Sequence, residues 1–143
     1  MTEKSFIKWL RRFIKKTGIK ELELSNRFDP TYNHTTALKE ISDKLIFGNA
    51  NNLPFEDNYF DLVISINTLH CLKCVDLEKS LIEMQRVSKK HKYLCVESYR
   101  NEVEKANLLY WQVTCEAFHD PDSWQWWFQK TGYNGDYSFI YFE

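Results

Sequence analysis

Glycine and proline are scarce in this chain, with four glycines and three prolines among 143 residues. This scarcity, together with 43% hydrophobic residues, excludes a fibrous or disordered chain and indicates a globular one. An excess of positive charge is also missing, because the formal net charge is -1, whereas general nucleic-acid binders rely on many Lys and Arg residues. We therefore expect a single folded domain over residues 1–143 that does not bind nucleic acid.

Long apolar segments are absent as well. Lys, Asp or Glu interrupts every apolar run before it reaches the roughly 20 residues that cross a bilayer. Lys4, Lys8 and Arg11 occupy the region where a signal peptide would have its apolar core. These absences predict a cytoplasmic protein without a membrane span, and free thiols for its four cysteines. Cys71-Leu-Lys-Cys74 has the spacing of half a zinc site, but no second pair completes four ligands, so we predict no metal site.

The first 18 residues predict an amphipathic helix. Apolar residues from Phe6 to Ile14 recur at helical spacing, Lys and Arg take the other positions, and Gly18 follows as a stop. Its basic face could meet an anionic membrane or a phosphate-bearing partner. A surface helix that packs its apolar face on its own domain has the same pattern, so both interpretations stay open.

The segment that follows predicts a β-α-β unit. Ile19–Leu24 alternates apolar and charged residues as a half-buried strand does, and Thr35 or Thr36 can cap a short helix. Leu45–Phe47 is then a short apolar strand ended by Gly48. Such a crossover implies parallel strands.

The second half of the chain has clearer periodicity. Asp61–Ile66 is a continuous apolar run, typical of a strand buried in the middle of a sheet. A helix capped by Asp76 is expected to run to Val87, and Tyr93–Val96 forms the next strand.

The remaining elements complete the chain. Residues 108–118 mix aromatic residues with Val and Thr, which predicts a long strand. A helix is expected from Asp120 through Lys130, with Gly132 as its stop, and Tyr137–Phe142 closes the chain as a strand. Three tryptophans in this helix could line a substrate site, but neighbouring positions cannot all share one face.

Two neighbouring segments carry a family resemblance. Gly48-Asn-Ala-Asn-Asn-Leu-Pro-Phe55, followed by Phe60-Asp-Leu-Val-Ile-Ser-Ile-Asn-Thr-Leu-His70, closely resembles the middle of class I S-adenosylmethionine-dependent methyltransferases of the type 11 kind. The resemblance covers residues 45–143. It implies an α/β fold, namely a shortened Rossmann-like domain with a mostly parallel sheet and an antiparallel C-terminal strand.

The resemblance also implies a set of site residues. In the family, an acid faces the adenine amino group and the next backbone amide meets the ring; here these positions are Asn49 and Ala50. The end of the second segment, from Asn67 to His70, would face the methionine arm of S-adenosylmethionine and a small-molecule methyl acceptor. Ligands of open α/β sheets bind beyond the carboxyl ends of strands, where Asn49, Asn67 and Glu97 would converge. We nominate His70 and Glu97 as catalytic bases.

The cofactor loop departs from the family. The family has an acid and a glycine-rich turn after its first strand, whereas Ser25–Asp29 contains no glycine, although Glu23 could replace the acid and bind the cofactor. Too few residues separate Leu24 from Leu45 for the family's second βα unit. Three interpretations follow: a methyltransferase with impaired cofactor binding, a non-catalytic remnant or interaction module, or an abridged gene product.

We predict that the chain forms a homo-oligomer or binds a partner chain at the shortened sheet edge. If Ile19–Leu24 takes the place of the lost unit, Leu45–Phe47 becomes a short apolar outer strand guarded only by Lys44. Light scattering at several protein concentrations tests this expectation. A folded species that stays strictly monomeric at tens of micromolar would contradict it.

Overall fold

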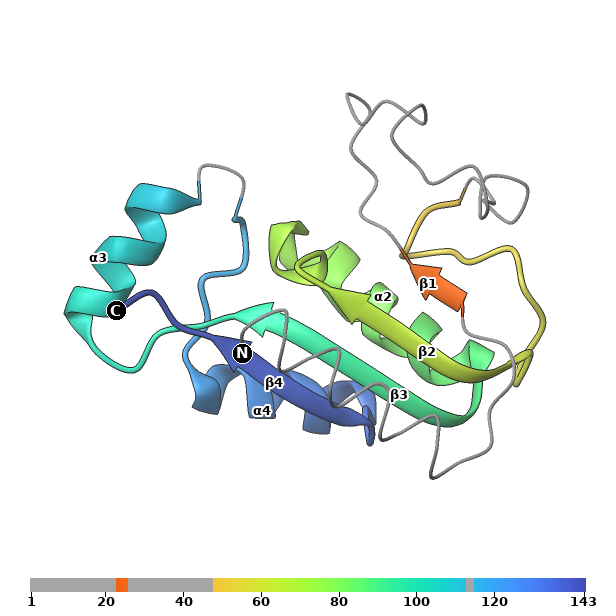
Figure 1. Cartoon of the computed structure of the whole chain (residues 1–143). Helices are drawn as coiled ribbons and strands as arrows, with labels where there is room; N and C mark the ends of the chain where they lie inside the picture. Colours follow the sequence, from red (N-terminus) through yellow and green to blue (C-terminus); the bar gives the residue numbers. More distant parts are fainter. Residues whose placement is uncertain (1–22, 26–47, 113–114) are drawn as a thin grey trace.

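A computed structural model describes residues 23–25, 48–112 and 115–143 (Figure 1). The elements follow the chain as β1 (Glu23–Ser25), β2 (Phe60–Ile66), η3 (Leu69–Cys71), α2 (Cys74–Val87), β3 (Ser88–Glu97), α3 (Glu102–Trp111), α4 (Pro121–Thr131) and β4 (Asp136–Ile140). The expected N-terminal helix, the helix near Thr35 and the strand Leu45–Phe47 lie outside the described residues. Among the helices described, none has the length and apolar character that crossing a bilayer requires.

The four described strands form one sheet in the order β1-β2-β3-β4, and every neighbouring pair is parallel. β2 lies between β1 and β3, and its residues 62–65 are buried, which confirms the predicted mid-sheet strand. On the side of β2 away from β3, the described part of the sheet ends at β1. Since Leu45–Phe47 is outside the described residues, the partner-binding edge stays a prediction.

The C-terminal strand runs parallel to β3, so the expected antiparallel strand is wrong. Tyr93 pairs with Asp136 and Glu97 pairs with Ile140. α4 starts near the end of β3, where the Ser98 hydroxyl donates to the carbonyl of His119, and packs back along the sheet. The chain therefore enters β4 from the edge at which β3 begins, and a crossover through a helix makes the two strands parallel.

The long strand expected over residues 108–118 is wrong in the described residues, since a helix covers its beginning. α3 ends at Trp111, and residues 115–118 have no regular secondary structure. The Asn101 side chain caps the helix by accepting from the amide of Glu104, while the Glu104 carboxylate accepts from the amide of Arg100. This reciprocal arrangement is close to a capping box, and it stabilises a helix start that the aromatic composition does not reveal.

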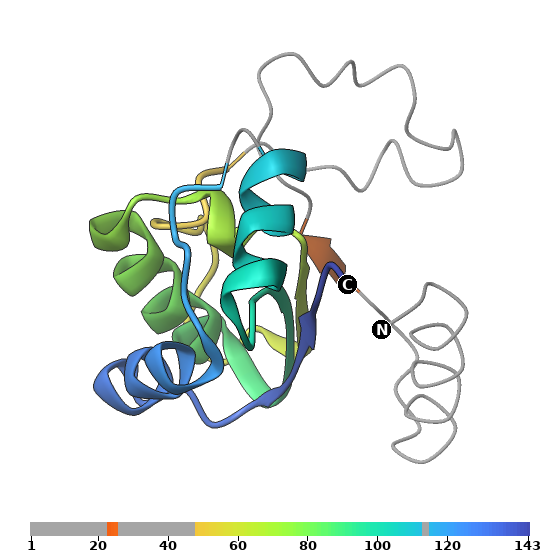
Figure 2. The same ribbon diagram turned by 90° about the vertical axis from the view of Figure 1, so that its left-hand side faces the viewer.

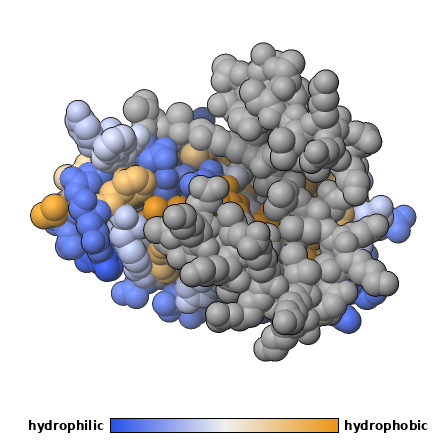
Figure 3. Space-filling view, viewed as in Figure 1, coloured by the Kyte–Doolittle hydropathy of each residue, from blue (hydrophilic) through white to orange (hydrophobic). Residues whose placement is uncertain are grey.

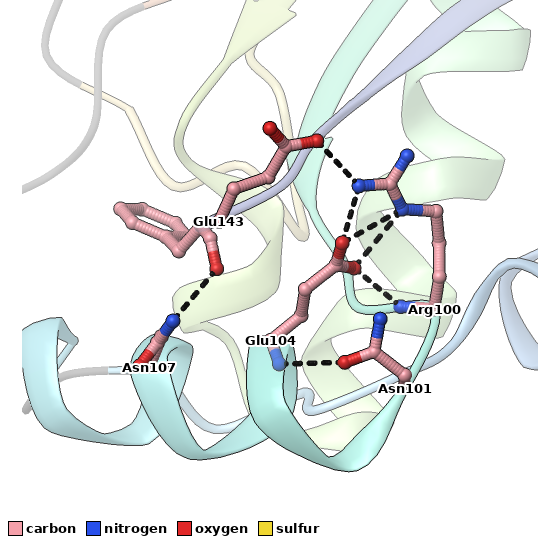
Figure 4. A network of polar contacts seen from close by, with 6 residues as sticks. Arg100, Asn101, Glu104, Asn107 and Glu143 are labelled. Carbon is pink, nitrogen blue, oxygen red and sulfur yellow. Dashed lines mark hydrogen bonds and ion pairs between the residues drawn. The ribbon is translucent and has the colours of Figure 1, made fainter.

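Side chains of α3 and of Arg100, just before it, contact the last residues of the chain (Figure 4). The Arg100 guanidinium pairs with the carboxylates of Glu104 and Glu143, the second at 2.7 Å. Asn107 Nδ2 donates to the carbonyl of Phe142 at 3.2 Å, and Arg100 lies over the Tyr141 ring. These contacts connect α3 to the chain just after β4.

α2 and α4 cover the same face of the sheet (Figure 2). α2 extends the expected helix by starting at Cys74, and Asp76 lies inside its first turn, so Asp76 is not the N-cap. α4 follows its sequence signals: the Asp120 carboxylate accepts from the amide of Ser123, and Gly132 ends the helix in the left-handed conformation at φ 70°. The core between helices and sheet contains Val63, Leu69, Leu77, Leu81, Met84, Val87, Leu94, Val96, Ala117, Trp124, Trp127, Phe128 and Tyr133.

A second apolar cluster lies on the other face of the sheet. It contains Leu62, Ile64, Tyr93 and Cys95, all nearly inaccessible to solvent. In Figure 3 hydrophobic side chains are visible on parts of this face. Both faces of β2 and β3 are thus apolar, which agrees with the continuous apolar runs of their sequences.

We predict that Gly135→Ala lowers the free energy of unfolding by about 1–3 kcal/mol, the usual range for overpacking. A Cβ atom at this position would lie 2.5 Å from Lys92 Cβ and 2.8 Å from the Lys92 carbonyl oxygen, which belongs to the backbone of β3. Urea unfolding measures the effect. Gly132→Asn is the control, because a Cβ there meets nothing within 4 Å and Asn tolerates the left-handed conformation. Equal stabilities of the two variants would contradict the prediction.

Candidate functional site

The carboxyl ends of β2 and β3 form the edge where the sequence predicts a site. Asn67 directly follows β2 with a positive φ of 51°, which is uncommon for residues other than glycine. Its amide donates to the carbonyl of Cys95 on β3 at 3.0 Å, and its side chain is exposed. The Thr68 hydroxyl donates to the carbonyl of Ile66 at 2.9 Å. The chain therefore turns sharply here and presents the Asn67 amide group at the edge.

His70 and Glu97, the two nominated bases, touch each other. His70 Nε2 lies 3.2 Å from Glu97 Oε2, and the side chains are 1% and 2% exposed. The backbone amide of Glu97 donates to His70 Nδ1 at 3.4 Å. Since Nδ1 accepts a hydrogen bond, we place the ring proton on Nε2, which faces the Glu97 carboxyl group. The two contacts hold one tautomer and one ring orientation.

The His70–Glu97 pair connects several segments. Glu97 Oε1 accepts from Gln112 Nε2 at 2.6 Å, at the end of α3, and the Glu97 carbonyl accepts from Trp124 Nε1 on α4 at 3.1 Å. The carbonyl of His70 accepts from the amides of residues 116 and 117, at 3.0 and 2.9 Å. We call His70, Glu97, Gln112 and Trp124 the edge network. It joins η3, β3, the end of α3, the following segment and α4.

The burial of His70 and Glu97 affects whether either side chain can reach a substrate proton. A general base must reach the proton that it removes, directly or through one water. His70 and Glu97 are buried and bonded to each other, which gives them a clear structural role at this edge. Their role as catalytic bases stays a prediction.

Asn49 and Ala50 lie in a tight turn before β2. The Asn49 carbonyl accepts from the amide of Asn52 at 2.9 Å, and Asn49 Oδ1 accepts from the amide of Asn51 at 3.3 Å. The Asn49 side chain is exposed, while Ala50 packs against the main core. An amide oxygen has two lone pairs, so Asn49 Oδ1 can accept a further hydrogen bond from an amine.

The turn is attached to the first turn of α2. Asn51 Nδ2 donates to Asp76 Oδ1 at 2.7 Å. Because α2 begins just after β2 and η3, its first turn is near the carboxyl edge of the sheet. The Asn49–Ala50 turn and Asn67 therefore belong to the same edge, as the sequence predicts.

Glu23 falls in β1, where its backbone pairs with Val63 of β2. The residues after β1, which correspond to the family's glycine-rich turn, lie outside the described residues. The predicted contact of Glu23 with a cofactor stays a prediction.

The cysteines are all free thiols in the structure. Burial raises the pKa of Cys115 to about 12, with a further contribution from Glu97, so this thiol is unreactive at neutral pH. No group of three or more His, Cys, Asp and Glu side chains that could hold a metal ion occurs in the part of the chain that the structure describes.

The three tryptophans of α4 differ in burial, because their spacing does not let them share one face of the helix. Trp124 and Trp127 are buried, and Trp127 Nε1 donates to His119 Nε2 at 2.9 Å. Trp126 is 55% exposed. Two of the three thus serve the core and do not form an aromatic wall.

Sequence reasoning missed Gln112, whose contact with Glu97 has no local signal. It also missed Glu83 and Arg86, which bind the segment before β2. The two residues are three positions apart on a helix and therefore lie next to each other, and this spacing was the signal that could have identified them as an ion pair.

One of three comparisons with known proteins identifies the kind of domain. The family model described as a methyltransferase domain matches residues 4–96, which is more than half of the chain. The solved structure of the YcgJ protein from Bacillus subtilis is similar over 91% of this chain, with 18% identity and a TM-score of 0.44. The matched region covers 48% of that protein, so this chain spans about half its length. No curated protein matches the chain significantly.

We predict that Gln112→Ala destabilises the fold by about 1–3 kcal/mol, the cost of leaving a buried acceptor without its donor. The reason is the 2.6 Å hydrogen bond to the Glu97 carboxylate inside the edge network. Urea unfolding again measures the effect. Gln129→Ala is the matched control, because Gln129 is exposed on α4. A Gln112 variant as stable as this control would show that the bond is energetically neutral.

Proposed function

This chain belongs to the methyltransferase domain family, and from this membership we propose that it binds S-adenosylmethionine weakly and transfers its methyl group to a small molecule. Use of this cofactor is general in the family. One observation carries the proposal: Asn67 and the Asn49–Ala50 turn present exposed or hydrogen-bonding groups at the same carboxyl edge. That edge is where open α/β sheets bind ligands.

The described residues fit the adenosine part of the cofactor. Asn49 Oδ1 retains acceptor capacity for the adenine amine, although a neutral amide makes a weaker bond than a carboxylate. Asn67 is exposed beyond β2 on the side expected to meet the methionine arm. Asn49 thus supports binding at the adenine end, and Asn67 supports binding at the methionine end.

The chain lacks the glycines that favour tight binding. No glycine occurs between Gly18 and Gly48, so side chains follow β1 where the family has bare backbone. Cβ atoms in this turn would crowd the ribose and the methionine. For this reason we propose weak affinity.

The bound cofactor would supply a methyl group on a positively charged sulfur. In the proposed reaction the acceptor's lone pair would bond to the methyl carbon as the carbon–sulfur bond breaks with its electrons going to sulfur, and the acceptor's proton would pass to a base or to water. Asn49 and Asn67 are the described residues that would hold the cofactor. The chain's contribution is mainly to hold the acceptor in line. In this proposal the hydrogen bond from the Asn67 amide to the Cys95 carbonyl positions Asn67, and His70 and Glu97 remain the candidate bases.

A non-catalytic binding or interaction module is the second candidate. The observation that favours it is the mutual burial of His70 and Glu97, which leaves both nominated bases engaged within the fold. Cofactor binding separates the two candidates, because a module that works through another protein does not need it.

We predict a dissociation constant above the low micromolar range for S-adenosylmethionine and for its demethylated product, S-adenosylhomocysteine, in calorimetric titrations. Asn49→Asp should tighten binding about fivefold, since a charge-assisted bond is worth about 1 kcal/mol more than a neutral one. Asn52→Asp is the matched control, because it adds the same charge to the same turn. Equal effects of the two substitutions would remove Asn49 from the site. No binding at millimolar ligand would refute the proposal and favour the non-catalytic module.

A further inference from the structure

The segment before β2 runs along α2 in the same direction. Residue 51 contacts Asp76 in the first turn of α2, and the amide of Asn58 donates to the carbonyl of Arg86 near its last turn, at 2.8 Å. We call residues 51–58 the strap. It leads from the Asn49–Ala50 turn at the carboxyl edge to the start of β2.

Glu83 is the central attachment point of the strap. Its Oε2 accepts from the amide of Leu53 at 2.7 Å, and its carboxylate takes two hydrogen bonds from the Arg86 guanidinium, each of 2.7 Å. The Arg86 hydrogen bonds lower the pKa of Glu83, against the opposing effect of burial. The carboxylate is therefore charged at neutral pH and binds the Leu53 amide strongly.

Arg86, also on α2, holds the strap through further hydrogen bonds. Its guanidinium donates to the carbonyls of Leu53 and Phe55, at 3.1 and 2.7 Å, and to the carboxylate of Asp57 at 2.9 Å. These contacts use the planar fork of several N–H groups that only arginine has. A lysine at this position keeps the charge but cannot bind all these oxygens at once.

Apolar contacts fix the inner side of the strap. Leu53 and Phe55 of the strap, and Ala50 of the preceding turn, pack against the main core. The Phe55 ring meets the Phe60 ring edge to face, with centroids 4.7 Å apart. The strap is thus held by the core on one side and by polar groups of α2 on the other. The turn that precedes it has little freedom to change shape.

We propose that Asp76, Glu83 and Arg86 are positioning residues that keep the Asn49–Ala50 turn in the shape that receives an adenine ring. The inference rests on the proposed function. A turn that is already ordered loses less conformational entropy on binding, so the attachment raises affinity without any contact to the ligand. Preorganisation matters most here because the glycine-rich side of the site is missing.

Two variants and one matched control test the proposal. Arg86→Lys removes the fork and retains the charge, and Asp76→Ala removes the acceptor of Asn51. Arg100→Lys is the control, because Arg100 also pairs with two carboxylates but does so at α3, away from the strap.

Two readouts are needed. Amide hydrogen exchange by NMR reports on Asn52 and Leu53, with Leu94 of β3 as the reference for global unfolding. Calorimetric titration with S-adenosylhomocysteine reports on affinity. In both test variants we expect exchange at Asn52 and Leu53 to rise about tenfold relative to Leu94, as local opening without global unfolding produces. Affinity should fall about three- to tenfold, and Arg100→Lys should change neither quantity.

The outcomes separate this inference from the proposed function. Unchanged exchange at Asn52 and Leu53, or faster exchange with unchanged affinity, overturns the positioning role. An equal loss of affinity in Arg100→Lys overturns it too, because the effect is then not specific to the strap. If the unaltered chain does not bind the ligand, the proposed function fails, and the positioning role for an adenine ring fails with it, even where exchange shows that α2 orders the turn.

Discussion

The contact between His70 and Glu97 determines the arrangement of the carboxyl edge. Burying two polar side chains is unfavourable unless each finds partners, and a carboxyl group has the largest such cost. The fold meets this requirement by bringing Gln112 to the carboxylate and the Glu97 amide to the ring. Each partner comes from a different place in the chain. The Glu97 side chain thereby connects the end of α3 to β3, and the His70 carbonyl connects the following segment to η3.

Two sets of polar contacts stabilise the carboxyl edge. The edge network holds the side next to β3, while the strap and α2 hold the side of the Asn49–Ala50 turn. Asn67 follows β2 between these two sides, with its side chain exposed. The groups that can meet a ligand are thus neutral amides supported by buried or partly buried charged groups. Such a site suits a reaction that depends on positioning more than on proton transfer.

The sheet explains why the site groups come together. All four described strands are parallel, so their carboxyl ends share one edge. The described helices return the chain from the end of β2 to the start of β3 and from the end of β3 to the start of β4. α2 and α4 cover one face and bury a core of large apolar side chains. Both β2 and β3 are apolar on both faces, which places them inside the domain and keeps their ends in a defined register.

The sequence by itself determined the elements whose signals are local. The apolar run of β2, the periodic apolar face of α2, and the Asp120 cap and Gly132 stop of α4 depend on residues within a few positions of each other, and these were predicted. Asn67 and His70 were also assigned to the carboxyl edge, since they follow a buried strand. Tertiary structure decided the rest. The parallel direction of β4, the contact of His70 with Glu97, and the hydrogen bonds of Arg86 with the strap depend on residues far apart in the chain. No local pattern predicts such pairs, because their geometry exists only after the sheet and its helices have packed together.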